Sequence, residues 1–117
     1  MTAPSLDDTF AALADPTRRA VIRALVERPR RAGELAAQVQ MSPPALSRHL
    51  RVLRQAGLVV ADGIEEDARV QVYRLAPAAL AEPRAWLDEV EQFWSQQLQS
   101  FKAHAEARSA KARRGSR

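Results

Sequence analysis

Cysteine is absent from the chain, which excludes disulfide bonds, thiolate metal ligands and cysteine nucleophiles together. Histidine is scarce as well: with only His49 and His104, a zinc site would need carboxylate ligands and a second chain. The spacing of the remaining residues indicates no glycine-rich phosphate loop, nucleophile elbow or paired-carboxylate pocket. We therefore expect neither an enzyme nor a protein that carries a cofactor.

Long hydrophobic runs are also missing. No apolar stretch approaches the roughly 18 residues that a membrane span requires, and MTAPSLDDTF lacks the basic-then-apolar layout of a signal peptide. We expect a cytoplasmic protein without a membrane partner. The 117 residues suit one domain, which we place at 5–101. The basic tail at 102–117 has almost no bulky apolar residue and is expected to be disordered.

Positive charge is unevenly distributed along the chain. The formal net charge of +4 divides into −3 for residues 1–15, +7 for 16–57, −5 for 58–100 and +5 for 101–117. A strongly positive central segment inside an otherwise acidic globule indicates a polyanionic partner such as nucleic acid. The alternative is a solvated, arginine-rich surface without a partner.

Three helices are predicted in the first forty residues. In SLDDTFAALA, Ser5 is the cap, and a narrow apolar stripe needs something to pack against: Leu6, Phe10 and Leu13. In DPTRRAVIRALVER, Asp15 is the cap and Pro29 ends the helix; the expected buried residues are Val21, Ile22, Leu25 and Val26. AGELAAQV forms a short third helix.

The stretch MSPPALSRHLRVLRQAGL, residues 41–58, places leucines and arginines in a regular order. Ser42 caps the predicted helix, Pro43 takes its first position, and Gly57 supplies the left-handed residue that ends it. At about 100° per residue, three leucines fall within one narrow arc: Leu46, Leu50 and Leu53. The opposite side carries arginines, so burial of the leucines turns the arginine face outward.

The hydrophobic period changes after Gly57. LVVAD and VQVYRL are rich in β-branched and aromatic residues and flank the short, charged GIEEDAR, which predicts a β-hairpin. A last helix follows at RAWLDEVEQFWSQQLQSF. Its apolar stripe is wider than a surface helix of a small domain requires, which suggests burial on two sides.

This order of elements, mainly α with a small β-hairpin, is typical of a winged helix-turn-helix domain. A helix fits the major groove of DNA, whereas a sheet face does not, so the helix at 42–56 is the predicted recognition helix. The preceding helices would hold its angle, and the hairpin, or wing, would reach the flanking backbone.

Four stretches resemble the ArsR family of bacterial winged-helix repressors, in particular the members without cysteine. They are FAALADPTRRAVIRAL at 10–25, GELAAQVQMSPPALSRHLRVLRQAGLV at 33–59, RVQVYRL at 69–75 and WLDEVEQFW at 86–94. The resemblance implies an obligate homodimer, joined through the first and last helices. It also implies that the dimer binds an imperfect inverted repeat near its own promoter and represses transcription.

The chain departs from the family's metal sensors. Positions that carry cysteine in those proteins are matched here by Arg31 to Gly33. Asp88, His104 and Glu106 are suitable types for a zinc site between terminal helices, but they lack the spacing of that site. We therefore predict no metal.

Double-stranded DNA is the expected partner of the recognition helix. Arg48 suits a bidentate contact to guanine, although a solvated arginine is the alternative, and residues farther along the helix suit phosphates. For His49, packing with one polar contact is favoured over base readout. Thr17 and Arg18 begin a helix whose amides could receive a phosphate, although a cap role is equally expected. The full candidate set is Ser42, Pro44, Ala45, Ser47, Arg48, His49, Arg51, Arg54, Arg69, Thr17 and Arg18.

The wing offers one candidate, Arg69, because its tip is acidic and would be repelled by phosphate. The dimer interface is expected to involve nine apolar residues of the terminal helices: Leu6, Phe10, Leu13, Trp86, Val90, Phe93, Trp94, Leu98 and Phe101. Two alternatives remain open: an effector pocket at the same seam, with the effector unknown, and a winged-helix module that binds an acidic protein surface.

Overall fold

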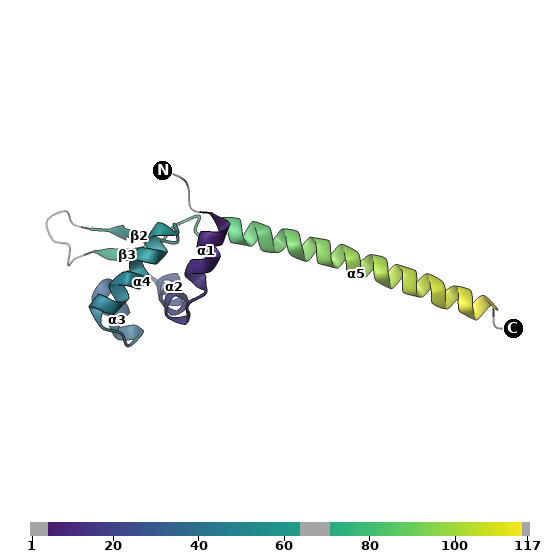
Figure 1. The fold of residues 1–117 in the computed structure, drawn as a ribbon, viewed down its shortest axis with the longest axis horizontal. Helices are drawn as coiled ribbons and strands as arrows, with labels where there is room; N and C mark the ends of the chain where they lie inside the picture. Colours follow the sequence, from purple (N-terminus) through teal and green to yellow (C-terminus); the bar gives the residue numbers. More distant parts are fainter. Residues whose placement is uncertain (1–4, 64–70, 116–117) are drawn as a thin grey trace. The chain divides into compact units, whose positions relative to one another are not determined.

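A computed structural model of the chain describes residues 5–63 and 71–115 (Figure 1). The chain divides into two compact units, residues 1–83 and 84–117. Unit 1 contains α1 (Leu6–Leu13), α2 (Pro16–Glu27), β1 (Arg30–Arg31), α3 (Ala32–Gln38), α4 (Pro43–Gln55), β2 (Val59–Asp62) and β3 (Val72–Leu75). The helix α5 (Ala81–Gly115) begins at the end of unit 1 and forms the described part of unit 2.

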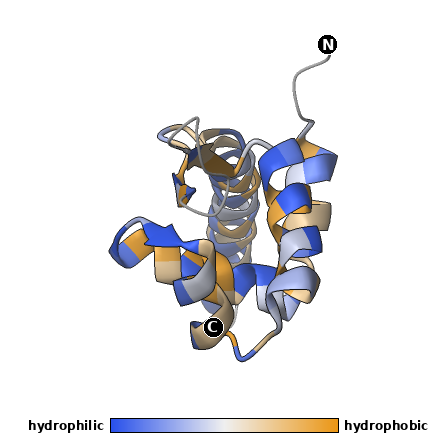
Figure 2. Ribbon diagram, turned by 90° about the vertical axis from the view of Figure 1, so that its left-hand side faces the viewer, coloured by the Kyte–Doolittle hydropathy of each residue, from blue (hydrophilic) through white to orange (hydrophobic). Residues whose placement is uncertain are grey.

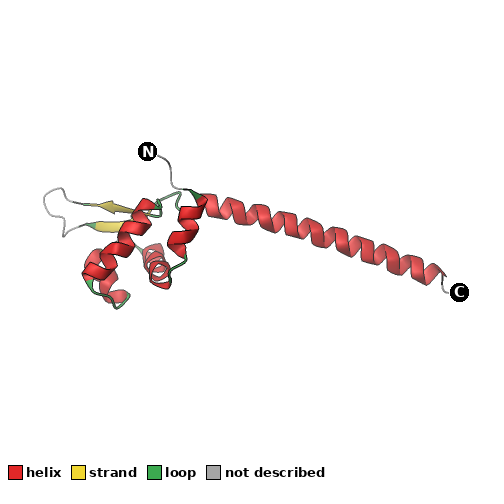
Figure 3. Cartoon of the chain, viewed as in Figure 1, coloured by secondary structure: helices red, strands yellow, loops and turns green. Residues whose placement is uncertain are grey.

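A small antiparallel sheet confirms the predicted hairpin and adds one strand to it. β2 pairs with β3, with Val59 opposite Leu75 (Figure 3). The short strand β1, which the sequence did not predict, pairs with the other edge of β3, so that Arg30 lies opposite Tyr73. The sheet therefore ties the segment before α3 to the hairpin that follows α4.

The core of unit 1 is built from one face of each helix. Figure 2 shows hydrophobic and hydrophilic residues side by side on these helices, as the periodicity predicts. The buried cluster comprises Ala12, Val21, Ile22, Ala24, Leu25, Leu35, Ala36, Leu46, Leu50, Leu53, Ala56, Leu58, Val59 and Tyr73. The prediction for Val26 was wrong, since its side chain is 67% exposed. Val26 lies one residue past the buried Leu25, and the 100° step turns it away from the core.

Helices α3 and α4 end in the same hydrogen-bonded motif, which after α3 makes the turn toward α4 tight. After α3, the N–H of Met41 donates to the carbonyl of Ala36, and Gln40 adopts a left-handed φ of 55°. After α4, the N–H of Leu58 donates to the carbonyl of Leu53, and Gly57 has a φ of 75°. These are Schellman motifs, which normally place glycine at the left-handed position.

Replacing Gln40 with glycine is expected to stabilise unit 1. A residue with a Cβ costs roughly 1 kcal/mol in the left-handed region, a cost that glycine avoids. We expect Gln40→Gly to raise the midpoint of urea unfolding. The matched change Gln38→Gly, at the last residue of helix α3, should lower it, because glycine is a poorer helix former than glutamine. A fall in the midpoint for Gln40→Gly would contradict the assignment of strain to this turn.

Helix α5 is longer than the predicted one and continues to Gly115. This differs from the disorder expected beyond Lys102. Residues 102–114 contain five alanines together with arginine and lysine, which are all strong helix formers, so the segment can be helical without a bulky apolar residue. Low apolar content therefore does not predict disorder in a segment whose residues have such high helix propensity.

Candidate nucleic-acid interface

Helix α4 is fixed to unit 1 by its leucines. Leu46, Leu50 and Leu53 are all buried, as predicted, and their burial sets the rotation of the helix about its axis. The hydroxyl of Ser42 accepts a hydrogen bond from the N–H of Ala45, so the residue caps the helix as predicted. The outward face is exposed along the whole helix: Ser42, Pro44, Ser47, Arg48, Arg51 and Arg54.

The arginines of α4 differ from most others in unit 1 in having no protein partner. Among the described residues, Arg48, Arg51 and Arg54 make no hydrogen bond or ion pair. Several other arginines, by contrast, are held by carboxylates: Arg28 by Glu34, Arg30 by Glu27 and Arg74 by Asp62. The three guanidinium groups on α4 are thus available to an external anion. Guanidinium groups bind phosphates and guanine edges with several parallel hydrogen bonds.

Arg18 and Arg19 are occupied by the end of helix α1. The last carbonyls of a helix lack partners within it. Arg18 donates to the carbonyl of Ala12 at 2.6 Å and to that of Ala11 at 3.2 Å, and Arg19 donates to that of Leu13 at 2.9 Å. Sequence reasoning missed this role. The spacing could have indicated it, because Arg18 and Arg19 follow the cap of α2 and lie only a few residues after the end of α1.

Arg18 also connects α1 to α4. Its Nη1 lies 3.3 Å from Nδ1 of His49 on α4. A guanidinium can only donate, so we assign Nδ1 of His49 as the acceptor and place the ring proton on Nε2. His49 is half-buried, and it lines a shallow depression together with Arg18, Ala45, Arg48 and Val52. His49 therefore has the packed position with a polar contact that was favoured over base readout.

Asp15 holds the start of α2 beside the same cluster. Its Oδ1 accepts hydrogen bonds from the N–H groups of Arg18, at 3.1 Å, and Thr17, at 2.8 Å, and it lies 4.0 Å from Nδ1 of His49. The N–H of Arg18 is the largest cause of the lowered pKa of Asp15, and the N–H of Thr17 and the positive charge of the Arg18 side chain add to it. The amide of Thr17, like that of Arg18, is thus already bonded to the cap and is not free for a phosphate.

The lowered pKa of Asp15 predicts how stability depends on pH. A carboxylate whose folded pKa lies below its unfolded value stabilises the folded state above the unfolded value, here 3.8. This contribution disappears as the pH falls through the folded pKa. Asparagine caps helices equally well but does not titrate. We therefore expect thermal melts of Asp15→Asn to show a shallower loss of stability below about pH 4 than the wild type does.

The control for that experiment is Glu91→Gln. Glu91 is an exposed carboxylate of α5 that accepts no hydrogen bond within residues 5–63 and 71–115. Its replacement should leave the acid limb of the melting profile unchanged. Parallel profiles for the wild type and Asp15→Asn would contradict a stabilising role for the ionised cap.

The wing is described only at its base. β2 and β3 form the hairpin, and Arg74 pairs with Asp62 across the two strands. The predicted contact Arg69 lies outside the described residues, as do the acidic residues Glu65, Glu66 and Asp67.

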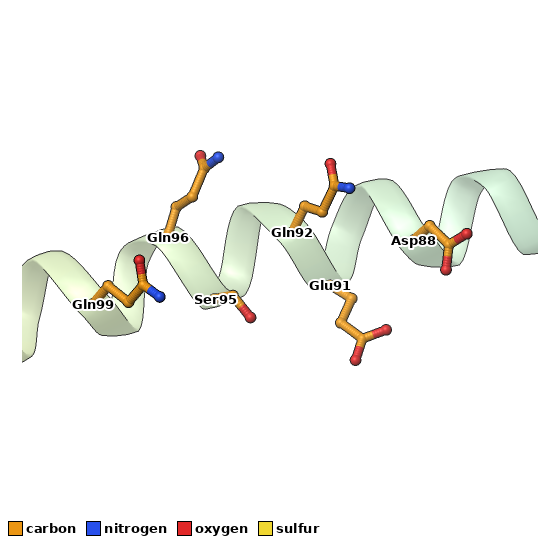
Figure 4. Close-up of a pocket in the computed structure, with 6 residues that line it drawn as sticks. All are labelled: Asp88, Glu91, Gln92, Ser95, Gln96 and Gln99. Carbon is orange, nitrogen blue, oxygen red and sulfur yellow. The ribbon is translucent and has the colours of Figure 1, made fainter.

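Helix α5 exposes a wide apolar face. The side chains of Phe93 and Trp94 are each 62% exposed and that of Phe101 is 73% exposed; Trp86, Leu87, Val90 and Leu98 are also exposed. On a helix these residues form one stripe. The opposite face is polar and carries Asp88, Glu91, Gln92, Ser95, Gln96 and Gln99 (Figure 4). Separation of this kind is typical of a helix that packs against a partner along one side.

The apolar stripe predicted on α1 is only partly covered within unit 1. Within unit 1, α1 buries Thr9 and Ala12. Leu6 and Leu13 are half-buried, and Phe10 is 36% exposed. The three predicted residues therefore lie at the edge of the unit 1 core and not inside it.

Two further properties follow from the described part of the chain. Within residues 5–63 and 71–115, no cluster of three or more histidine or acidic side chains could hold a metal ion. Over the same ranges, no helix combines the length and the apolar character needed to cross a bilayer.

Sequence comparisons connect this geometry with known regulators. Residues 15–60 match the model of a family described as bacterial regulatory protein, arsR family. The HTH-type transcriptional regulator Rv2034 of Mycobacterium tuberculosis is 41% identical over 98 residues, which cover 83% of this chain and 85% of the relative. The transcriptional repressor SdpR of Bacillus subtilis is 35% identical over 54 residues, which cover 46% of this chain and 60% of that relative.

Solved structures agree with the sequence comparisons. An ArsR-like transcriptional regulator from Rhodococcus sp. RHA1 matches with a TM-score of 0.73 and 30% identity over 87% of this chain and 91% of that one. The homodimeric winged helix-turn-helix DNA-binding domain Mb0332 from Mycobacterium bovis matches with a TM-score of 0.59 and 24% identity over 79% of this chain and 82% of that one.

The packed helices, the capped helix with an exposed arginine face and the antiparallel hairpin together define a winged helix-turn-helix fold. The chain belongs to the ArsR family of bacterial transcriptional regulators. The predictions of fold class and family are thereby confirmed. Because these relatives are named as transcriptional regulators, the chain is a transcriptional regulator rather than an enzyme, as predicted.

Proposed function

We propose that the protein is a homodimeric repressor that binds an inverted-repeat operator, including one near its own promoter, through α4. The observation that carries this proposal is the outward face of α4, where three arginines have no partner among the described residues and the leucines fix their direction. A helix so presented can enter the major groove, and its N-terminal residues then meet base edges. Binding at a promoter would place the protein with the chromosome in the bacterial cytoplasm.

The candidate contacts divide by position along α4. Pro44, Ala45, Ser47 and Arg48 lie in its first turns, where side chains reach bases, and Arg48 supplies the bidentate contact to guanine. Arg51 and Arg54 lie farther along and suit phosphates, which contribute affinity and salt dependence but no sequence information. Ser42, which caps the helix, can also contact DNA from its exposed position.

Three other candidates act mainly by positioning α4 in this proposal: Thr17, Arg18 and His49. Their polar groups already bond to Asp15, to α1 or to each other. Arg69 remains a candidate contact of the wing, outside the described residues.

Dimerisation is supported by the exposed apolar stripe of α5, which a monomer would leave in water. Two copies of one helix can bury such a stripe against each other, and a two-fold dimer reads an inverted repeat because its symmetry matches that of the DNA. The relative SdpR is named as a repressor and the neighbour Mb0332 as homodimeric, which supports the same assignment here.

The test is a fluorescence-anisotropy titration of the full-length protein. One duplex carries the DNA upstream of its own gene, and the other carries the same bases in scrambled order, at two salt concentrations. We expect the upstream duplex to bind on the order of a thousandfold more tightly, with a steep dependence on salt. Equal, weak binding to both duplexes would overturn the autoregulatory proposal and favour a module that binds an acidic protein surface.

A further inference from the structure

The C-terminal part of α5 concentrates positive charge on an ordered helix. Residues 102–115 carry a formal charge of +4, with Glu106 as the single carboxylate, whereas residues 81–101 of the same helix carry −3. The cationic side chains are all exposed: Lys102, Arg108, Lys111, Arg113 and Arg114. Nζ of Lys102 lies 4.0 Å from Oε1 of Glu106, so one of these charges is paired locally.

Packing and helix stability do not account for this charge. Beyond Phe101 the segment has no bulky apolar side chain, so it has no face to bury in a core or a dimer seam. Cations in the last turn of a helix interact favourably with its dipole, which explains Arg113 and Arg114. That effect falls off within one turn and therefore does not explain Arg108 and Lys111.

The positions of the basic side chains suit an extended anion. His104, Arg108 and Lys111, at i, i+4 and i+7, line one side of the helix together with the small Ala112 and border a shallow depression. Small side chains between cations let a phosphate chain approach the helix closely. Arg108 and Lys111 have no partner among the described residues.

We propose that the side of α5 that carries His104, Arg108 and Lys111 forms a second DNA-contacting surface, which binds backbone phosphates beside the operator without reading bases. This inference rests on the proposed function, because the ligand of the surface is the DNA that α4 binds. Tethering to a bound α4 raises the effective concentration of the phosphates, so a few weak contacts suffice. At about 1.5 Å per residue, Arg108 lies roughly 40 Å along α5 from its start at Ala81, which is the length of about 12 base pairs.

The test is a triple variant of the full-length protein, Arg108→Gln, Lys111→Gln and Arg114→Gln. Glutamine keeps a similar helix propensity and removes the charge. We expect the slope of log affinity against log salt to become shallower by about 0.9 for each phosphate that is no longer bound. Affinity for the operator and for a scrambled duplex should fall by the same factor, because phosphate contacts carry no sequence information.

The control is Lys102→Gln with Glu106→Gln, which changes the same helix but leaves its net charge unaltered. Its salt slope should match that of the wild type. An unchanged salt slope in the triple variant would overturn the proposal. A triple variant that binds DNA as the wild type does but no longer binds anionic lipid vesicles would overturn it as well. A wild type without operator preference would contradict the proposed function alone, since the slope on the scrambled duplex still tests this surface.

Discussion

Replacing Arg48 with alanine is expected to lower affinity for the operator about 5- to 150-fold and to leave affinity for a scrambled duplex much less affected. A bidentate contact to a base is worth about 1–3 kcal/mol of discrimination, and 1.4 kcal/mol corresponds to a factor of ten. Arg48 lies in the second turn of α4, where side chains reach base edges, and no described residue competes for its guanidinium. Arg48→Ala should therefore relax sequence preference.

Arg51→Ala is expected to act differently, although it removes the same group one turn later. A phosphate contact contributes equally to every sequence, so both duplexes should bind more weakly by the same factor. The salt slope should fall by about 0.9 for the one phosphate involved. Anisotropy titrations of both variants against the two duplexes, at several salt concentrations, separate the two roles.

The matched control for both variants is Arg23→Ala. Arg23 is an exposed arginine of α2 that has no partner among the described residues, so its removal changes the net charge by the same amount. We expect the control to keep the operator preference. If all three variants bound with the same affinity and salt slope as the wild type, the assignment of α4 as the DNA-contacting helix would be wrong. Circular dichroism would show that each variant retains its helices.

The second large effect is expected on dimerisation, when apolar residues of α5 are replaced. We expect Phe93→Ala combined with Trp94→Ala to convert the proposed dimer to a monomer at micromolar concentrations. Full burial of one such side chain contributes about 1.5–3 kcal/mol, and a symmetric dimer lacks four of them in this variant. The dissociation constant of the dimer should therefore rise by at least about ten-thousandfold.

The same variant should keep the fold of unit 1, because neither residue belongs to its buried cluster. Operator affinity should fall steeply, since a monomer engages one half-site only. Sedimentation equilibrium over a range of concentrations measures the first effect, and anisotropy measures the second.

The control for this surface lies on the opposite side of the same helix. Gln92→Ala combined with Gln96→Ala changes two residues of the polar face shown in Figure 4. We expect this variant to remain dimeric. A wild-type protein that sediments as a monomer, or a Phe93 and Trp94 variant that sediments as a dimer, would show that the stripe has another use.

Local signals predicted much of unit 1. Ser5, Asp15 and Ser42 cap the helices that they were expected to cap, and Gly57 ends α4 in a left-handed conformation. These features involve neighbours within about five residues, so the chain encodes them directly. The hairpin was predictable for the same reason, because alternating residues and a short connection specify it locally.

Other features were not predictable because they depend on contacts distant in sequence. The strand β1 has two residues and exists through its pairing with β3, some forty residues later. Gln40 takes a left-handed position that sequence rules reserve for glycine, because the turn between α3 and α4 requires it. Neither short strands nor strained turns carry a periodic signal.

The order of the helices and the outward direction of the arginines on α4 follow from the amino-acid sequence alone, because helix periodicity and burial of leucine are enough for both. Which of the arginines are available depends on how the helices pack. Arg18 and Arg48 are chemically identical, but Arg18 lies within hydrogen-bonding distance of the carbonyls that end α1, and Arg48 has no such neighbour among the described residues. A guanidinium bonds to whatever acceptor the fold brings within about 3 Å, and that distance is a property of packing and not of composition.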